Sequence, residues 1–588
     1  MAINNLENLK VKEFKLKILQ GILLFLATAL ICRLFYLQIF QYKTIAQRAQ
    51  YSTSKISILG APRGIIYDRN GKILASNKQA ISVVVYPNKL KTEKEKLEVY
   101  NKLSKILKTD HNKLKDTLLK LPEKAPLPIR LQSNITTEEA IKIVERQYQL
   151  PGINIQVEPI RFYPNSSLAA HVLGYISEID EDELSRRPER KLGDLVGRYG
   201  VEKLFDDILR GTDGKKIVEV DRYGKPIDPH YKHSVIQIKP KAGKNIHLTI
   251  DSELQKVCEE ALRKTNANSA VIAVNPNSGE VLALASHPTY DPNIFITPIS
   301  NSTWNSFIAK KVFLNRALLA YPPGSIWKPI TLFAALDSMA VKPNERFHVS
   351  EAVYLGSTRF GDWTSKEGVY SLQESLAWSR DTAFYQIAKR LTAKQIKDWG
   401  VKLGGGEKTG IELLGEEVGI VPDEEWKKKN MGEIWYPGNT LHYSIGQGFL
   451  LLTPTQVARI YSAIANGSKV PKLQLVKQID KYTKPLQLTE SYKINPNFLK
   501  VIRDGLFLCI EKGTGVASKL ENIKIAGKTG SAEVPGSNKT HGWFVAYAPV
   551  DNPEIVVAVI AEKAGHGGSI AAPIAKRIFE NYFGLDKS

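Results

Sequence analysis

The sequence has 588 residues, 43% of them hydrophobic and 24% charged, which is ordinary for a folded protein and excludes a largely disordered chain. This length is enough for several domains and at least one large hydrophobic core. The formal net charge of +21 indicates an anionic partner or simply a basic surface, and the sequence has no zinc-finger spacing or RNP-type motif that would indicate nucleic acid.

The first predicted element is a hydrophobic segment of 23 residues, Ile18 to Phe40. At ~1.5 Å rise per residue, a helix of this length crosses a ~30 Å hydrocarbon layer. Lysines are frequent before it and only Lys43 and Arg48 follow closely, so the positive-inside rule places residues 1–17 in the cytoplasm and the bulk of the chain outside. Ala27-Thr28-Ala29 resembles a signal-peptidase site, but the hydrophobic run continues beyond it, which favours an uncleaved anchor.

Residues 41–243 mix strand and helix signals. Gly60 to Asn77 predicts a β-hairpin, because Asp68-Arg69-Asn70-Gly71 is a turn signal between two apolar runs. Residues 89–150 are rich in Lys, Leu and Glu with helical periodicity, and they are punctuated by Pro122, Pro126 and Pro128. The rest of this region predicts short strands and turns.

The character of the sequence changes near Lys239 to Gly243, so we expect a second large domain over residues 244–588. Apolar residues alternate on both sides of a turn in 269–288 and again in 542–562, which predicts two hairpins. Helix-forming segments such as Thr453 to Asn466 lie between them. Strands at both ends with helices in the middle indicate an α+β fold, in which the two ends of the domain build one antiparallel sheet.

The stretch YPPGSIWKPITLFAAL, residues 321–336, contains a serine and a lysine three residues apart. Pro322-Pro323-Gly324 is unsuited to helix and Ile326 to Met339 is typical of it, so we place Ser325 at the helix start. Its backbone N–H then lacks an intrahelical partner and faces the positive end of the helix dipole, which suits a nucleophile whose product is an oxyanion. Lys328 lies on the same face and can take the hydroxyl proton where burial or nearby cations lower its pKa.

A Ser-x-x-Lys spacing is weak evidence on its own. It also occurs at Ser52 and Lys55, where no chemistry is expected, and a serine cap followed by a surface lysine has the same pattern. A second stretch, AWSRDTAFYQ, strengthens the catalytic interpretation because it places a cluster of polar residues between two helical segments: Ser379, Arg380 and Asp381.

A third stretch, IAGKTGSAE, places Lys528, Thr529 and Gly530 at the end of an apolar, strand-like run. Lys528 offers a positive charge and Thr529 a hydroxyl for a carboxylate, and Gly530 lets a substrate backbone approach closely. A glycine in a strand also marks a bulge or tight packing, so this motif alone is weak as well.

The three motifs, taken in this order, resemble the signature of penicillin-binding proteins and class A β-lactamases. Three further segments look like the non-catalytic pedestal of class B penicillin-binding proteins: Arg63 to Asn77, Arg161 to Ile176 and Gly200 to Gly214. A fourth, Trp435 to Ala458, looks like the segment that lines their transpeptidase cleft. Within class B, Asp362-Trp363, the Ser-x-Asp form of the second motif, and Gly565 to Lys576 are similar to the penicillin-binding protein 2 group, the cell-elongation transpeptidases.

This resemblance implies an architecture in four parts. They are a cytoplasmic tail (1–17), a transmembrane anchor (18–40), an elongated, mostly β or α+β pedestal (41–243), and an α+β transpeptidase domain with an antiparallel sheet flanked by helices (244–588). The catalytic domain would lie on the periplasmic or extracytoplasmic side of the bacterial plasma membrane.

The resemblance also implies acyl transfer between peptidoglycan stem peptides. Ser325 would attack the carbonyl between two D-alanines, with Lys328 as general base, Ser379 as proton relay and Asp381 holding that network. Lys528 and Thr529 would bind the terminal carboxylate beside Gly530, and the N–H groups of Ser325 and Ser531 would form the oxyanion hole. β-Lactams would acylate Ser325, and the expected partners are the membrane and a glycosyltransferase of the elongation complex, with no nucleic acid and no cofactor.

We expect no metal site. Some relatives carry a histidine near the Asp-Trp pair, but Glu367 and Gly368 occupy that stretch here. His541 and His566 have no carboxylate or cysteine at a ligand-like spacing. The three cysteines, Cys32, Cys258 and Cys509, have no metal or redox spacing and are expected as free thiols.

Three alternatives use the same motifs. A β-lactamase would need a deacylating glutamate motif, which the sequence lacks, and would need no anchor or pedestal. A β-lactam sensor would need an output module, for which 17 cytoplasmic residues leave little room. A catalytically inactive scaffold of wall synthesis is the third, and the intact Ser and Lys motifs argue against it.

Overall fold

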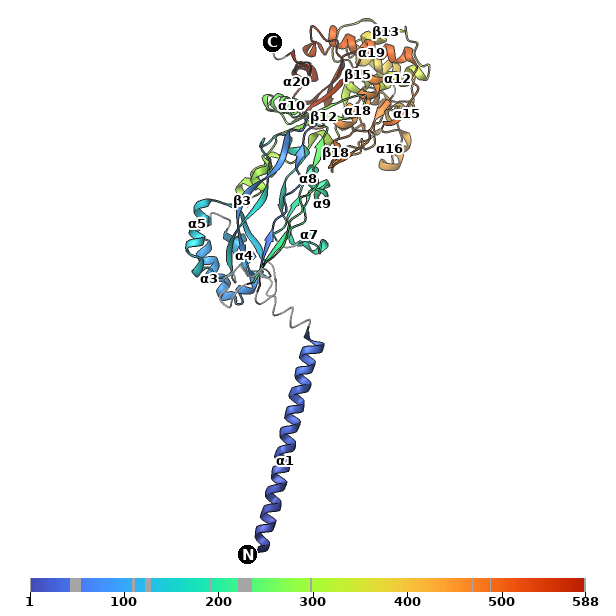
Figure 1. Ribbon diagram of the computed structural model, residues 1–588. Helices are drawn as coiled ribbons and strands as arrows, with labels where there is room; N and C mark the ends of the chain where they lie inside the picture. The colour runs from blue at the N-terminus through green and yellow to red at the C-terminus, as the bar shows by residue number, and fades with distance from the viewer. Residues whose placement is uncertain are drawn as a thin grey trace.

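The computed structural model describes residues 2–42, 54–107, 111–121, 128–190, 193–219, 235–296, 299–467, 469–486 and 488–585. Several residues used in the sequence predictions lie outside these ranges: Lys43, Arg48, Ser52, Pro122 and Pro126. The described chain forms three parts, which are an N-terminal helix, a middle domain and a C-terminal domain (Figure 1).

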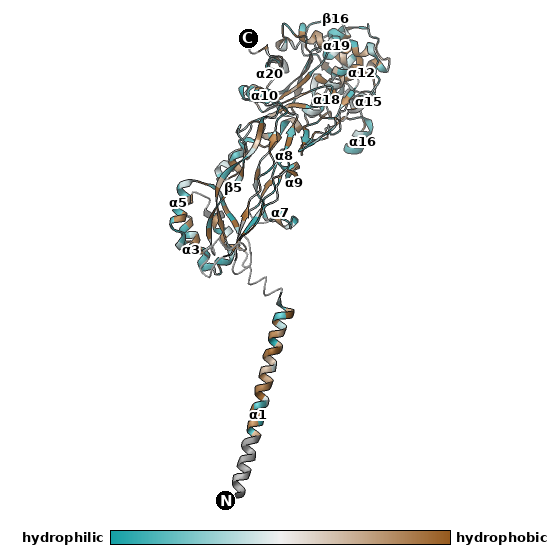
Figure 2. Ribbon diagram, in the orientation of Figure 1, coloured by the Kyte–Doolittle hydropathy of each residue, from teal (hydrophilic) through white to brown (hydrophobic). Residues whose placement is uncertain are grey.

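The N-terminal helix α1 (Ala2–Phe35) continues into a short π-helical stretch, η1 (Tyr36–Phe40). Phe14–Phe40 is apolar and contacts no other part of the protein closely enough to be buried, and its brown colour in Figure 2 marks its hydropathy. A row of exposed Leu, Ile and Phe side chains of this length is unfavourable in water. The helix therefore fits a single-pass membrane anchor.

The middle domain is built on a long central strand, β3 (Ile73–Val85). It pairs in antiparallel fashion with β2 (Ile66–Tyr67), β4 (Ile129–Ile135) and β5 (Ile153–Phe162). The β2–β3 hairpin confirms the turn predicted at Asp68 to Gly71.

Helices α3 (Glu93–Leu103), α4 (His111–Leu119) and α5 (Thr137–Glu145) pack against this sheet. The side chains that they bury there include Leu103, Leu114, Leu118 and Ile143. They account for the helical periodicity of residues 89–150. The helical prediction was wrong at β4, which follows the last of the predicted breaks at Pro128. Its apolar ends, Ile129 and Ile135, are buried where this strand pairs with β3.

A buried ion-pair network joins three distant segments of the middle domain. The Arg63 and Arg161 Nε atoms each lie 2.6 Å from a carboxylate oxygen of Glu202, whose side chain is fully buried. These residues belong to three of the segments that resemble class B pedestals. The buried Glu202 carboxylate in the third segment needs a positive partner, and Arg63 and Arg161 in the other two segments supply it.

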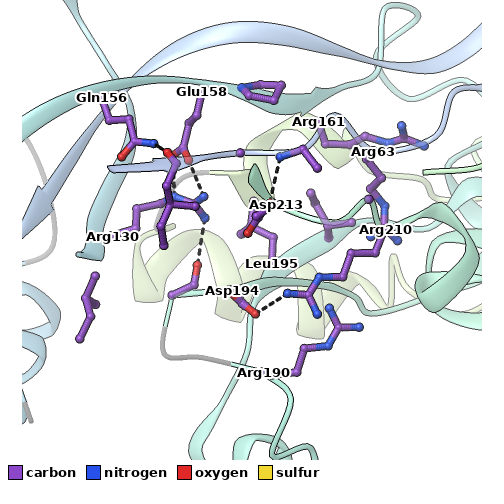
Figure 3. Close-up of a pocket in the computed structure, with 18 of the residues that line it drawn as sticks. Arg63, Arg130, Gln156, Glu158, Arg161, Arg190, Asp194, Leu195, Arg210 and Asp213 are labelled. Carbon is purple, nitrogen blue, oxygen red and sulfur yellow. Dashed lines mark hydrogen bonds and ion pairs between the residues drawn. The ribbon is translucent and has the colours of Figure 1, made fainter. Parts of the chain in front are cut away.

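A cavity of about 640 Å³ lies beside this network, lined by β-strands and loops of the middle domain (Figure 3). Arg130 pairs with Glu158 at 2.6 Å and Arg210 pairs with Asp194 at 2.8 Å in its wall. A three-stranded sheet, β1 (Ser54–Leu59), β8 (Gly214–Glu219) and β9 (Val235–Ile238), completes the domain.

The middle and C-terminal domains share a sheet. Strand β10 (Ile246–Leu248) pairs in parallel with β2 of the middle domain and antiparallel with β18 (Val476–Ile479) of the C-terminal domain. Backbone hydrogen bonds therefore cross the boundary between the domains and hold the C-terminal domain on its pedestal.

The C-terminal domain contains a five-stranded antiparallel sheet in the order β12-β11-β23-β22-β21. Its strands are β11 (Ser269–Val274), β12 (Val281–His287), β21 (Ala526–Glu533), β22 (Thr540–Ala548) and β23 (Ile555–Ala561). This arrangement confirms both predicted hairpins and the prediction that the two ends of the domain build one sheet.

Helices cover both faces of this sheet, so its strands are buried on both sides. α10 (Ser252–Lys264) and α20 (Gly567–Tyr582) pack on one face, and α18 (Pro454–Asn466) and α12 (Lys328–Asp337) belong to the core on the other. The predicted helix at Thr453 to Asn466 is confirmed as α18. The α+β fold with an anchor and a pedestal is likewise confirmed.

Candidate active site

Ser325 lies in a 3-10 turn, η6 (Gly324–Trp327), directly before α12. The predicted position at a helix start is confirmed, although the regular helix begins only at Lys328. Gly324 has a φ of 59°, and its N–H donates to the carbonyl of Gly446 at 2.8 Å. A Cβ on Gly324 would lie 2.8 Å from the carbonyl oxygen of Ser531. The turn Gly324–Trp327, here called the serine turn, therefore packs closely between the loop at Gly446 and strand β21.

Lys328 is fully buried at the first turn of α12. Its Nζ donates to Asp381 Oδ1 at 2.6 Å, to the carbonyl of Ser379 at 2.8 Å and to Ser379 Oγ at 3.1 Å. Lys328 thus joins the first motif to the second. Within the described residues, the Ser325 hydroxyl has no hydrogen-bond partner, and its side chain is half-buried, so it is open to a ligand.

The second motif forms the turn between α13 (Leu372–Ala377) and α14 (Asp381–Ala388), as the sequence indicates. Ser379 has a φ of 55°, in the left-handed region that non-glycine residues rarely adopt. This conformation directs both its carbonyl and its hydroxyl to the Lys328 ammonium.

The third motif lies inside β21 rather than at the end of a strand. Lys528 is fully buried, and burial, together with the positive charge of Lys328, lowers its pKa to about 8. Its Nζ donates to the carbonyl of Thr529 at 3.0 Å. The Thr529 hydroxyl lies 2.6 Å from that of Thr514, which in turn lies 3.4 Å from Cys509 Sγ.

Gly530 lies where β21 passes the serine turn. A Cβ at this position would lie 2.9 Å from the carbonyl oxygen of Pro323 and 3.0 Å from Cγ2 of Ile326. Close packing of β21 against the turn is therefore one reason for a glycine here. The next residue, Ser531, has its hydroxyl 3.3 Å from Nδ1 of His566.

The two histidines that flank the last hairpin lie in different settings. His541 packs edge-on against Tyr321 and accepts the N–H of Lys563. His566 contacts Ser531. Among the described residues, no three His, Cys, Asp or Glu side chains are grouped so that they could hold a metal ion. Cys258 and Cys509 are free and buried, as expected.

Sequence reasoning missed Thr514, which contacts Thr529, and gave no role to Gly446, which contacts the serine turn and lies in the segment Trp435 to Ala458. Neither belongs to a motif of catalytic residue types, and only the GQG pattern at 446–448 marks a turn. It also assigned no role to Arg380, which is buried beside the site.

Comparisons with known proteins agree with this geometry. Residues 269–580 match the family model of the penicillin binding protein transpeptidase domain, and residues 58–248 match that of the penicillin-binding protein dimerisation domain. The peptidoglycan D,D-transpeptidase MrdA of Haemophilus influenzae is 32% identical, covering 96% of this chain and 90% of that protein. MrdA of Escherichia coli K12 is 30% identical, covering 94% of this chain and 91% of its own.

Solved structures agree as well. The penicillin-binding protein PBP2 of Helicobacter pylori, in complex with MreC, superimposes with a TM-score of 0.78 at 27% identity, covering 91% of this chain and all of that one. The two domains, in the order that the family models give them, are thus found together with the three motifs and with an apolar N-terminal helix. The chain belongs to the class B penicillin-binding proteins, in the penicillin-binding protein 2 group.

Proposed function

We propose that the chain is a serine D,D-transpeptidase that cross-links peptidoglycan stem peptides during cell-wall elongation, through an acyl-enzyme on Ser325. The observation that carries this proposal is the position of Lys328. It is buried directly after the serine turn and bonded to Ser379 and Asp381, while Lys528 lies on the strand packed against that turn. The names of the relatives support the same reaction.

The first half-reaction follows from these positions. The Ser325 hydroxyl attacks the carbonyl between two D-alanines, and Lys328, having transferred one proton to the Asp381 carboxylate 2.6 Å away, accepts the hydroxyl proton. The ester Oγ–C bond forms as the peptide C–N bond breaks, and Ser379 relays a proton to the leaving D-alanine amine. The N–H groups of Ser325 and Ser531 bind the oxyanion, a contribution of about 3 kcal/mol per donor in other acyl-transfer enzymes.

The second half-reaction transfers the acyl group. An amine of a neighbouring stem peptide attacks the ester carbonyl, loses a proton to the Lys328 network, and releases the Ser325 hydroxyl. Asp381 holds Lys328 in place throughout. Lys528 in its charged form, with the Thr529 hydroxyl, binds the terminal carboxylate of the donor peptide. β-Lactams that mimic this end acylate the same serine.

We place the catalytic domain on the extracytoplasmic side of the plasma membrane. The exposed apolar helix and the lysines before it support this orientation. The proposed division is a tail (1–17), an anchor (18–40), a pedestal (41–243) and a transpeptidase domain (244–588). The last boundary precedes β10, which contributes to the sheet shared by the two domains.

We also propose that the chain works with a membrane glycosyltransferase of the elongation machinery. Two of the similar structures are a PBP2–MreC complex and a peptidoglycan synthase complex that coordinates polymerization and crosslinking. Their similarity over 91% and 96% of this chain supports assembly into comparable complexes.

The test is labelling of the full-length protein with fluorescent penicillin. The wild type should form a long-lived adduct that Ser325→Ala abolishes, and Ser52→Ala, which changes the other Ser-x-x-Lys sequence, is the matched control and should label normally. A rapidly hydrolysed adduct would indicate a β-lactamase. A folded protein that does not label would support a scaffold. Release of D-alanine from a stem-peptide substrate separates the enzyme from a sensor.

A further inference from the structure

Arg380 lies between Ser379 and Asp381 in the chain, but its guanidinium is bonded to other residues. It is 1% exposed. Its Nε lies 3.3 Å from Asp362 Oδ1, which makes an ion pair without a hydrogen bond. Its Nη1 donates to the Tyr370 hydroxyl at 3.1 Å, and its Nη2 donates to the carbonyl of Lys366. The guanidinium also lies 5.0 Å from the centroid of the Tyr370 ring. All of these partners belong to one segment, 362–370.

Asp362 holds the other side of the same turn. Its side chain is fully buried. Its Oδ2 accepts the backbone N–H of Thr382 at 3.1 Å and lies 3.0 Å from the Thr382 hydroxyl. Because Thr382 is in the first turn of α14, Asp362 caps this helix from outside it. One carboxylate therefore fixes both the helix start and the arginine before it.

The turn between these contacts is strained. Ser379 has a φ of 55°, and such a conformation persists only where its surroundings determine it. The segment 362–370 contacts the chain both before and after Ser379. Nε1 of Trp363 donates to the carbonyl of Trp378 at 3.1 Å, and Asp362 accepts the N–H of Thr382. Ser379 itself presents its carbonyl and hydroxyl to Lys328.

We propose that Arg380, clamped by Asp362, is a positioning residue of the Ser325 site. It holds the Ser379 turn in the geometry that receives the Lys328 ammonium, and it touches no reacting atom. This inference rests on the proposed function of the site. Loosening the clamp should slow acylation, whereas ligand affinity should change little, because the carboxylate-binding residues lie on β21 and not on this turn.

The test measures acylation of the full-length protein by fluorescent penicillin in stopped flow, which separates the dissociation constant of the first complex from the acylation rate constant. Arg380→Met and Asp362→Asn should each lower the rate constant tenfold or more, to order of magnitude, with the dissociation constant nearly unchanged. Each single variant also leaves one buried charge unpaired and should lower the Tm.

The double variant separates positioning from stability. Arg380→Met with Asp362→Asn removes both buried charges, so its Tm should recover towards the wild type while acylation stays slow. Arg380→Lys keeps the charge but loses the planar fork, and its rate constant should fall between those of Arg380→Met and the wild type. Arg359→Met, which breaks an exposed ion pair with Glu351, is the matched control and should acylate normally.

Two results would overturn the inference. One is a double variant whose acylation recovers together with its Tm, which would make Arg380 purely structural. The other is a wild-type rate constant in folded Arg380→Met. A folded wild-type protein that does not label at all would instead contradict the proposed function, so the two failures are distinguishable.

Discussion

The Lys328 ammonium lies 2.6 Å from the Asp381 carboxylate, with the lysine side chain fully buried and that of the aspartate 17% exposed. Removing one partner of a buried ion pair lowers the stability of the fold more than replacing both partners by apolar residues, because it leaves one buried charge uncompensated. Among the described residues, Lys328 is also the only lysine whose ammonium group is bonded to the Ser379 turn, and this contact holds it there. Stability and catalysis should therefore respond together when the carboxylate is neutralised.

Asp381→Asn should slow penicillin acylation by about 10²-fold, because the carboxylate no longer holds Lys328, the proposed proton acceptor, in place. Its free energy of unfolding should fall by about 3 kcal/mol. Stopped-flow labelling and urea denaturation measure the two effects. Asp398→Asn, which breaks an exposed pair with Lys394, should change neither. Acylation at the wild-type rate in Asp381→Asn would remove the aspartate from the mechanism.

The pKa of Lys528 predicts how the affinity for penicillin depends on pH. Burial lowers this pKa from 10.5 to about 8, so the side chain is charged below pH 8 and neutral above it. Because the charged form binds the substrate carboxylate, affinity for penicillin should fall as the pH rises through about 8. Lys528→Arg keeps its charge across this range and should not show that fall. Equal pH profiles for the two proteins would show that another group titrates.

Local elements of the fold could be predicted from the sequence because they depend on near neighbours. The β11–β12 and β22–β23 hairpins each have alternating apolar residues around a turn, and α18 has a threonine cap at one end and Gly467 at the other. The proximity of Ser325 and Lys328 was predictable for the same reason, since a spacing of three residues places them in consecutive turns.

Contacts between distant segments could not be predicted in this way. Strand β4 forms because β3 lies beside it, and its own sequence does not distinguish it from the helical residues around it. The bond between Gly324 and Gly446 depends on two loops more than a hundred residues apart. Arg380 is polar and central to a motif, yet only the folded segment 362–370 reveals its partners.

Glu202 is predicted to hold the pedestal together. Burial opposes its charged form, but Arg161 and Arg63 more than offset this and lower its pKa below the ordinary value. Its stabilising effect should therefore be complete above pH 4.5 and disappear as the pH falls through the lowered pKa. Glu202→Gln should lower the free energy of unfolding by about 3–5 kcal/mol. Glu253→Gln, at an exposed pair with Lys72, is the control, and equal stability of the two variants would contradict the prediction.

Gly446 and Gly448 offer a matched test of how the serine turn is held. Both have positive φ, 79° and 80°, so alanine brings similar backbone strain at either position. A Cβ at Gly446 would lie 2.0 Å from the carbonyl oxygen of Gly324, beside Ser325, whereas at Gly448 the nearest atom is 3.8 Å away. Gly446→Ala should therefore displace the turn and slow acylation about 10²-fold, and Gly448→Ala should acylate nearly as wild type. Equal rates in the two variants would mean that backbone strain, rather than the contact with Gly324, governs this loop.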